Sequence, residues 1–156
     1  MSVTLQERLA ILQDISKTWL ELMRSLRGLS DEQIERPGTV GDWSVKQVMG
    51  HVAFWDKHLI DEVRTLEAGQ APVDATSTES TDWNLDQANA SRAADDAGRG
   101  ISSVKAEMDS THQKLMDLLE VTPVISREVV KSDTYGHYPE HTAAIRAWRD
   151  TLSKAG

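Results

Sequence analysis

The chain has 156 residues, a formal net charge of -8 and no cysteine. This length fits one domain spanning residues 1–156, and the 39% hydrophobic and 27% charged fractions are ordinary for a globular protein. The negative charge repels nucleic-acid phosphates and anionic membrane surfaces, so neither is expected as a partner. Without cysteine, a metal must be held by histidine and carboxylate, and any thiol chemistry must use a thiol supplied as a substrate.

The sequence also gives an expectation for cellular location. No apolar run approaches the ~20 residues that a membrane-spanning helix requires. The polar N-terminus lacks the apolar region of a signal peptide. We therefore expect a cytoplasmic protein.

Two amphipathic helices are predicted in the first half of the chain. Apolar residues three and four positions apart between residues 5 and 26 predict the first helix, which Gly28 ends. Ser44 followed by Gln47 is the pattern of a capping box, and it starts a second helix whose apolar stripe covers residues 45–66.

The second half predicts two further helices after a loop at residues 68–83, which are rich in Gly, Pro, Ser and Thr. Residues 84–120 favour a helix that is kinked or broken at 93–100, where two glycines occur. A partly extended connection at 121–133 precedes a last helix near 135–152. Four amphipathic helices that cannot bury their stripes alone predict an all-α four-helix bundle, and its moderately long connections leave room for crossovers.

The histidines are the candidates for chemistry. His137 and His141 are four residues apart at the start of the last helix, so both project from one face and could bind one metal ion. Such a spacing also arises by chance among five histidines. A third ligand must come from another helix, and His51 lies on the flank of the second helix's apolar stripe. His58 and His112 are expected at the surface.

Two segments carry a resemblance to a known superfamily. Residues 41–51, GDWSVKQVMGH, resemble the segment that opens the second helix in DinB/YfiT-like metal-binding proteins. Residues 137–141, HYPEH, followed by IRAWR at 145–149, resemble the superfamily's second motif and are especially similar to the ClbS/DfsB branch. Less specifically, residues 82–84 and Asn89 are similar to the start of the third helix in that branch.

The resemblance implies an up-down-down-up bundle, a homodimer, and a metal site formed by His51, His137 and His141. The superfamily also includes the N-terminal domain of mycothiol-dependent maleylpyruvate isomerase. Because the chain ends at Gly156, without that enzyme's second domain, we do not expect that particular activity.

Three protein ligands leave open positions on an ion, which is typical of catalytic rather than structural metal sites. The leading hypothesis is a metal-dependent enzyme of detoxification or resistance, either a small-molecule hydrolase or an S-transferase that uses a low-molecular-weight thiol. The alternatives are a binding protein that sequesters a ligand or metal, and a helical bundle that serves only as an interaction module. Imidazole suits zinc, nickel, iron and copper, and we expect zinc or nickel.

Three further residues are candidates for the site. Trp83 and Tyr135 lie at element ends near the expected metal and could line a substrate pocket. Glu140, between the two C-terminal ligands in sequence, could act as a catalytic base. The favoured interpretation of Glu140 is a solvated carboxylate that complements the helix dipole.

Overall fold

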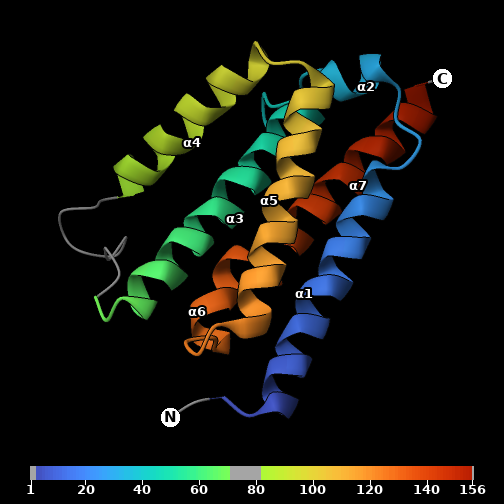
Figure 1. Cartoon of the computed structure of the whole chain (residues 1–156). Helices are drawn as coiled ribbons and strands as arrows, with labels where there is room; N and C mark the ends of the chain where they lie inside the picture. Colours follow the sequence, from blue (N-terminus) through green and yellow to red (C-terminus); the bar gives the residue numbers. More distant parts are fainter. Residues whose placement is uncertain (1–2, 71–81, 156) are drawn as a thin grey trace.

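A computed structural model describes residues 3–70 and 82–155, which form a bundle of helices (Figure 1). The long helices of the bundle are α1 (Leu5–Leu26), α3 (Val45–Glu67), α5 (Ile101–Val121) and α7 (Tyr138–Ala155). The remaining elements are α2 (Asp31–Glu35), α4 (Asp82–Ala97), α6 (Arg127–Val130) and the 3-10 helix η1 (Lys131–Asp133). The predicted all-α bundle is therefore confirmed.

The long helices follow an up-down-down-up order. Figure 1 shows α1 and α7 running in one direction and α3 and α5 in the other. This order requires a return segment, and α4 carries the chain back to the end at which α5 begins. The predicted interruption at residues 93–100 is confirmed, because one helix ends at Ala97 and the next begins at Ile101. The connection at 121–133 is partly extended, as predicted, because the backbone is extended at Thr122 and Ser126. Its second part, from Arg127 to Asp133, is helical, and Ser126 caps that short helix.

Side-chain caps set the starts of the helices. The Ser44 hydroxyl accepts a hydrogen bond from the backbone N–H of Gln47, and the Gln47 side chain accepts one from the backbone N–H of Ser44. The predicted capping box is thus confirmed, and it fixes the first turn of the helix that carries His51. Thr4 and Glu7 form the same reciprocal pair at the start of α1.

The core lies where the apolar stripes of the bundle helices face one another. It is formed by buried side chains that include Ile11, Ile15, Leu22, Val48, Val52, Leu59, Met108, Leu115, Leu119 and Ile145. The predicted stripe of α1 is only partly buried, because Leu5 and Leu9 are 71% and 50% exposed. Across residues 3–70 and 82–155, no helix combines the length and hydrophobicity that crossing a membrane requires.

Polar contacts hold α4 against α3. Lys46 is only 2% exposed, and its Nζ donates to the carboxylate of Glu35 and to two backbone carbonyls in the turn between α4 and α5. The indole Nε1 of Trp55 donates to the side-chain oxygen of Asn89 at 3.0 Å. Because these donors come from α3, the position of α4 depends on hydrogen bonds as well as on apolar packing.

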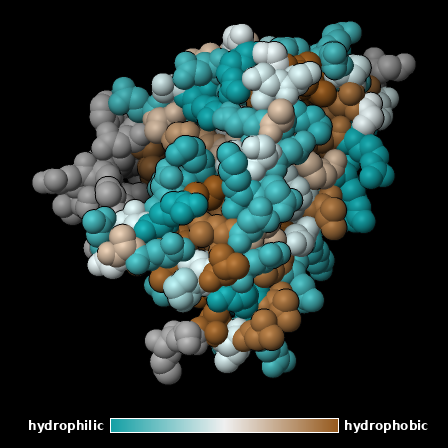
Figure 2. Space-filling model, in the orientation of Figure 1, coloured by the Kyte–Doolittle hydropathy of each residue, from teal (hydrophilic) through white to brown (hydrophobic). Residues whose placement is uncertain are grey.

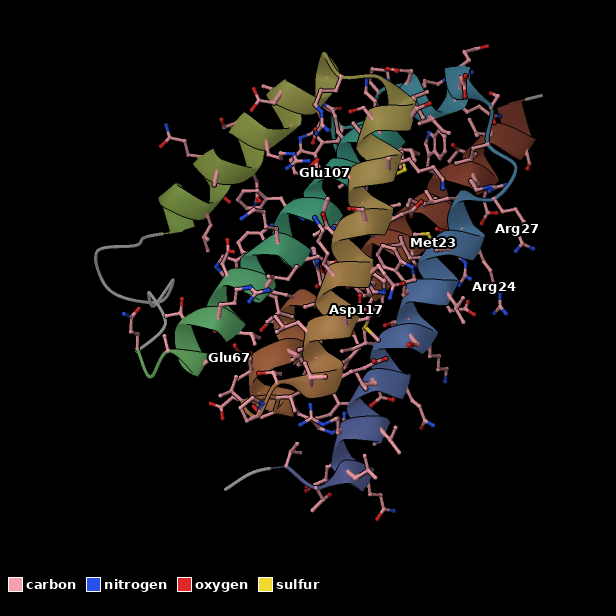
Figure 3. All side chains as sticks on the ribbon, viewed as in Figure 1. Met23, Arg24, Arg27, Glu67, Glu107 and Asp117 are labelled. Atoms are coloured by element: carbon pink, nitrogen blue, oxygen red, sulfur yellow. The ribbon has the colours of Figure 1, made fainter. Side chains whose placement is uncertain are left out.

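Gly50 is the point of closest approach between these two helices. A Cβ atom at this position would overlap the buried carboxylate of Asp96. That carboxylate is held by ion pairs with Arg92 and Arg99, and both arginines also contact Glu107 of α5. Figure 3 labels Glu107 where α4 and α5 approach each other. Asp96 therefore cannot move aside without disturbing a network that spans two helices.

The substitution Gly50→Ala tests this packing. We expect it to lower the free energy of unfolding by about 1–3 kcal/mol through overpacking, although alanine alone favours a helix interior by ~1 kcal/mol over glycine. The measurement is urea unfolding followed by circular dichroism. Gly98→Ala is the matched control, because a Cβ there would meet only a backbone oxygen at 3.8 Å. A stabilised Gly50→Ala variant would contradict the described contact.

Candidate metal centre

The structure brings the three predicted metal ligands together. His51 comes from α3, His137 immediately precedes α7, and His141 lies in the first turn of α7. Nε2 of His137 is 3.1 Å from Nε2 of His51 and 2.8 Å from Nε2 of His141. One nitrogen from each ring lies within 4.8 Å of the other two. His141 is 8% exposed, and the other two are partly buried.

Hydrogen bonding alone does not satisfy this arrangement. Each nitrogen of a neutral imidazole offers either one N–H or one lone pair in the ring plane, so Nε2 of His137 cannot bond well to both neighbours. Two ligands ~2.1 Å from one ion, at ordinary coordination angles, lie about 3.0–3.4 Å apart, close to the observed spacings. The Nδ1 atom of His137 is buried without a hydrogen-bond partner among the described residues. The donor set therefore fits a divalent metal ion better than it fits a hydrogen-bonded cluster.

Burial keeps these imidazoles neutral. It is the larger cause that lowers the pKa of His141 to about 3 and that of His51 to about 4, and neighbouring imidazoles account for the rest of each shift. The pKa of His137 is also lowered by burial. Since a metal competes with protons for the same nitrogens, rings that are neutral at pH 7 are ready to bind a cation.

A buried polar cluster adjoins the histidines. The hydroxyl of Tyr138 donates to Oδ1 of Asp56 at 2.6 Å, and Nδ1 of His112 lies 3.3 Å from Oδ2 of the same carboxylate. The indole of Trp19 stacks on the His112 ring at a centroid distance of 3.6 Å. Asp56 of α3 thus contacts His112 of α5 and Tyr138 of α7. Tyr138 directly follows His137 in the chain.

The predicted surface position of His112 is wrong, because its ring is only 8% exposed. Its spacing from the buried Met108 and Leu115, four and three residues away, places it on the inward face of α5. Asp56 occupies an equivalent position on the buried stripe of α3. The spacing of both residues from buried apolar neighbours indicated that they face the core. A pattern of apolar residues alone passes over polar residues at such positions.

The remaining predicted site residues lie in three different settings. Trp83 is in the first turn of α4, and its side chain lies outside the described residues, as do positions 71–81 of the predicted loop. Tyr135 is partly buried, and its hydroxyl accepts a hydrogen bond from Arg127 at 3.3 Å. Glu140 is exposed in the first turn of α7, where a carboxylate complements the helix dipole. A catalytic role for Glu140 and pocket roles for the two aromatic residues stay predictions.

Fold and site together define a class, the all-α bundle in up-down-down-up order with a three-histidine cluster. Residues 15–152 match the family described as the mycothiol maleylpyruvate isomerase N-terminal domain. The chain belongs to this family, and so to the DinB/YfiT-like helical superfamily, and the matched region includes all three histidines. Comparisons with curated proteins and with solved structures found no match. Similarity to the ClbS/DfsB branch stays a prediction.

The cluster predicts one metal ion per chain. Protein purified without a histidine tag should contain about one equivalent of divalent metal, and His141→Ala should lose it, because two imidazoles alone hold an ion weakly. Elemental analysis measures the metal, and circular dichroism should show unchanged helix content. Glu140→Gln is the control, since this exposed neighbour on α7 should keep the full metal content. A full metal content in His141→Ala would remove His141 from the site.

The stability that the histidine cluster supplies should depend on pH. Because the folded-state pKa values of His51 and His141 lie well below the ordinary value of 6.5, the unfolded chain binds more protons between about pH 4 and 6.5. The stability supplied by these neutral rings is present above pH 6.5 and is lost as the pH falls toward 4.

Thermal melting at pH 7.5 and pH 5.5, with zinc or with a chelator, measures this dependence. Zinc binds the native state, so it should raise the melting temperature at pH 7.5. Because His51 and His141 stay neutral in the folded protein down to about pH 4, a rise should persist at pH 5.5, whereas the melting temperature with chelator should be lower at pH 5.5 than at pH 7.5. His51→Ala should show little rise at either pH. No rise with zinc at pH 7.5, or an undiminished rise in the variant, would contradict the proposed ligand set.

Proposed function

We propose that this protein is a metal-dependent enzyme that acts on a small electrophilic molecule in detoxification or resistance. The observation that supports this proposal is the number of ligands. Within the described residues, the cluster contains three histidines and no fourth histidine or carboxylate. A divalent ion held by three protein ligands keeps positions open, and there it can activate a nucleophile or polarise a substrate as a Lewis acid.

The surroundings of His51 suit a small organic substrate. Its ring is partly exposed, and the indoles of Trp43 and Trp55 lie at centroid distances of 5.2 and 6.4 Å from it. Aromatic walls beside a few polar groups are typical of small-molecule sites. In this proposal the histidines hold the ion, the two indoles contact the substrate, and Glu140 is the candidate for moving a proton.

The co-substrate is proposed to be a low-molecular-weight thiol. The family description contains a thiol, mycothiol, and the chain itself contains no cysteine that could serve as a nucleophile. An open position beside neutral imidazoles suits a thiolate, because binding to a metal favours the deprotonated sulfur. We therefore place S-transfer ahead of hydrolysis.

Turnover of electrophiles distinguishes the possibilities. Metal-free protein and protein reloaded with zinc or nickel would be assayed on aryl halides and epoxides, with mycothiol, with cysteine and without thiol. We expect metal-dependent turnover that requires a thiol and that falls by about 100-fold or more in His141→Ala. Gly98→Ala is the control, because it is distant in sequence from the ligands. It shows whether activity is lost merely through producing and purifying a variant.

The other outcomes separate the alternatives. Metal-dependent turnover without a thiol would support the hydrolase instead. Stoichiometric ligand binding without turnover would contradict an enzyme and support a sequestering protein, which is the second candidate function.

We also propose a homodimer formed through α1. Leu9 and Leu20 of α1 are 50% and 53% exposed, and a groove between α1 and α5 includes Leu12 and Met116. Figure 2 shows hydrophobic side chains among hydrophilic ones on the face that α1 and α5 form. The groove also contains Lys17 and Glu120, so opposite charges from two copies could pair across a two-fold axis. Sedimentation would then give twice the 17.3 kDa chain mass.

A further inference from the structure

A second group of potential metal ligands lies two turns further along α3. His58 and Glu62 occupy successive turns of α3, and Asp133 of η1 faces them. Nδ1 of His58 is 3.3 Å from Oδ2 of Asp133, and one ligand atom from each of the three residues lies within 4.8 Å of the others. The Asp133 side chain is only 15% exposed and that of His58 is 38% exposed.

A simple ion pair accounts for only part of this arrangement. A protonated His58 would compensate Asp133, but the described ion pairs give Glu62 no lysine or arginine partner. Two carboxylates and one imidazolium would leave a net charge of -1. Burial and then Asp133 raise the pKa of Glu62, and the hydrogen bond to Asp133 raises the pKa of His58. The Asp133 carboxylate thus favours the protonated form of both neighbours, although burial is the larger cause for Glu62.

We propose that His58, Glu62 and Asp133 form a second divalent-cation site. With His58 neutral, one divalent ion compensates both carboxylates and brings the net charge of the group to zero. The 3.3 Å between Nδ1 of His58 and Oδ2 of Asp133 is the separation of two ligands ~2.2 Å from one ion. One imidazole and two carboxylates suit Mn²⁺ better than three imidazoles do, so the two sites should differ in metal preference.

This site is distinct from the three-histidine cluster. His58 follows His51 by seven residues, which is a rise of about 10 Å along a helix. The indole of Trp55 lies between the two rings in sequence, with its centroid 6.4 Å from His51 and 5.0 Å from His58. Metal ions that share one reacting group lie about 3.5–4 Å apart, so the two sites would act separately. An ion here would tie η1 to α3, and η1 immediately precedes the segment that carries His137.

The test uses full-length protein already loaded with one equivalent of Zn²⁺. Mn²⁺ is then added at pH 7.5, and free Mn²⁺ is measured by electron paramagnetic resonance. We expect one further equivalent to bind, with affinity reduced about tenfold or more in His58→Ala and in Asp133→Asn. Asp61→Asn is the matched control for charge, because this exposed carboxylate beside Glu62 pairs with Lys57 and lies outside the group.

Three results would overturn the proposal: no Mn²⁺ bound beyond the Zn²⁺, unchanged Mn²⁺ affinity in either variant, or an equal loss in Asp61→Asn. The last would show a general effect of net charge. Circular dichroism verifies the fold of each variant, and Asp133→Asn preserves the side-chain shape if His58→Ala does not fold. Binding of the first Zn²⁺ equivalent is measured separately, so a negative result here leaves the three-histidine centre and the proposed enzymatic function unaffected.

Discussion

The carboxylate of Asp56 determines how the start of α7 meets α3. It accepts a hydrogen bond from Tyr138 and faces His112, so one buried group connects three helices of the bundle. Burial raises the pKa of this carboxyl group, whereas its hydrogen bonds with His112 and Tyr138 oppose that rise. Removing one hydrogen-bond partner from such a buried polar group costs roughly 1–3 kcal/mol, because the remaining group is left unsatisfied. Tyr138 is therefore held in place, and with it the adjacent His137 and, one turn later, His141.

The neutral state of the histidine cluster has the same physical origin. Apolar stripes exclude water from the meeting point of α3 and α7, and that exclusion makes an imidazolium costly. The rings remain in place because their helices are fixed elsewhere, by the Ser44 cap, by the contact of Gly50 with Asp96 and by the Asp56 cluster. The three imidazoles of the cluster do not fully satisfy one another's hydrogen bonds. The stability of the surrounding helices offsets the cost of holding them together.

Much of the fold follows from hydrophobic periodicity and capping patterns. The helix starting at Ser44 and the interruption before Ile101 were both predictable from local sequence. The pair His137 and His141 was predictable from its spacing, whereas the assignment of His51 needed the resemblance of residues 41–51 to a known motif.

Other features depend on contacts between distant segments. Asp56 and His112 look like interruptions of an apolar stripe until the two helices are placed side by side. The overlap that Gly50 avoids involves Asp96, 46 positions later in the chain. Likewise, η1 supplies Asp133 to a group on α3 from a connection that showed no helical pattern. Tertiary packing decides each of these contacts. The periodicity of a helix indicates which residues face inward, but it does not indicate which partner they meet.

The separation of the ligands along the chain has a consequence for folding kinetics. His51 and His137 are 86 residues apart, and the entropy of closing so long a loop must be overcome before they can meet. The parallel placement of α3 and α5, with α4 between them in sequence, adds further non-local contacts that slow assembly. The three ligands come together only when α3 and the start of α7 are placed side by side, so we expect a metal ion to bind a chain that is already largely folded. An ion that binds this late would change the unfolding rate more than the folding rate, and so would lengthen the lifetime of the folded bundle.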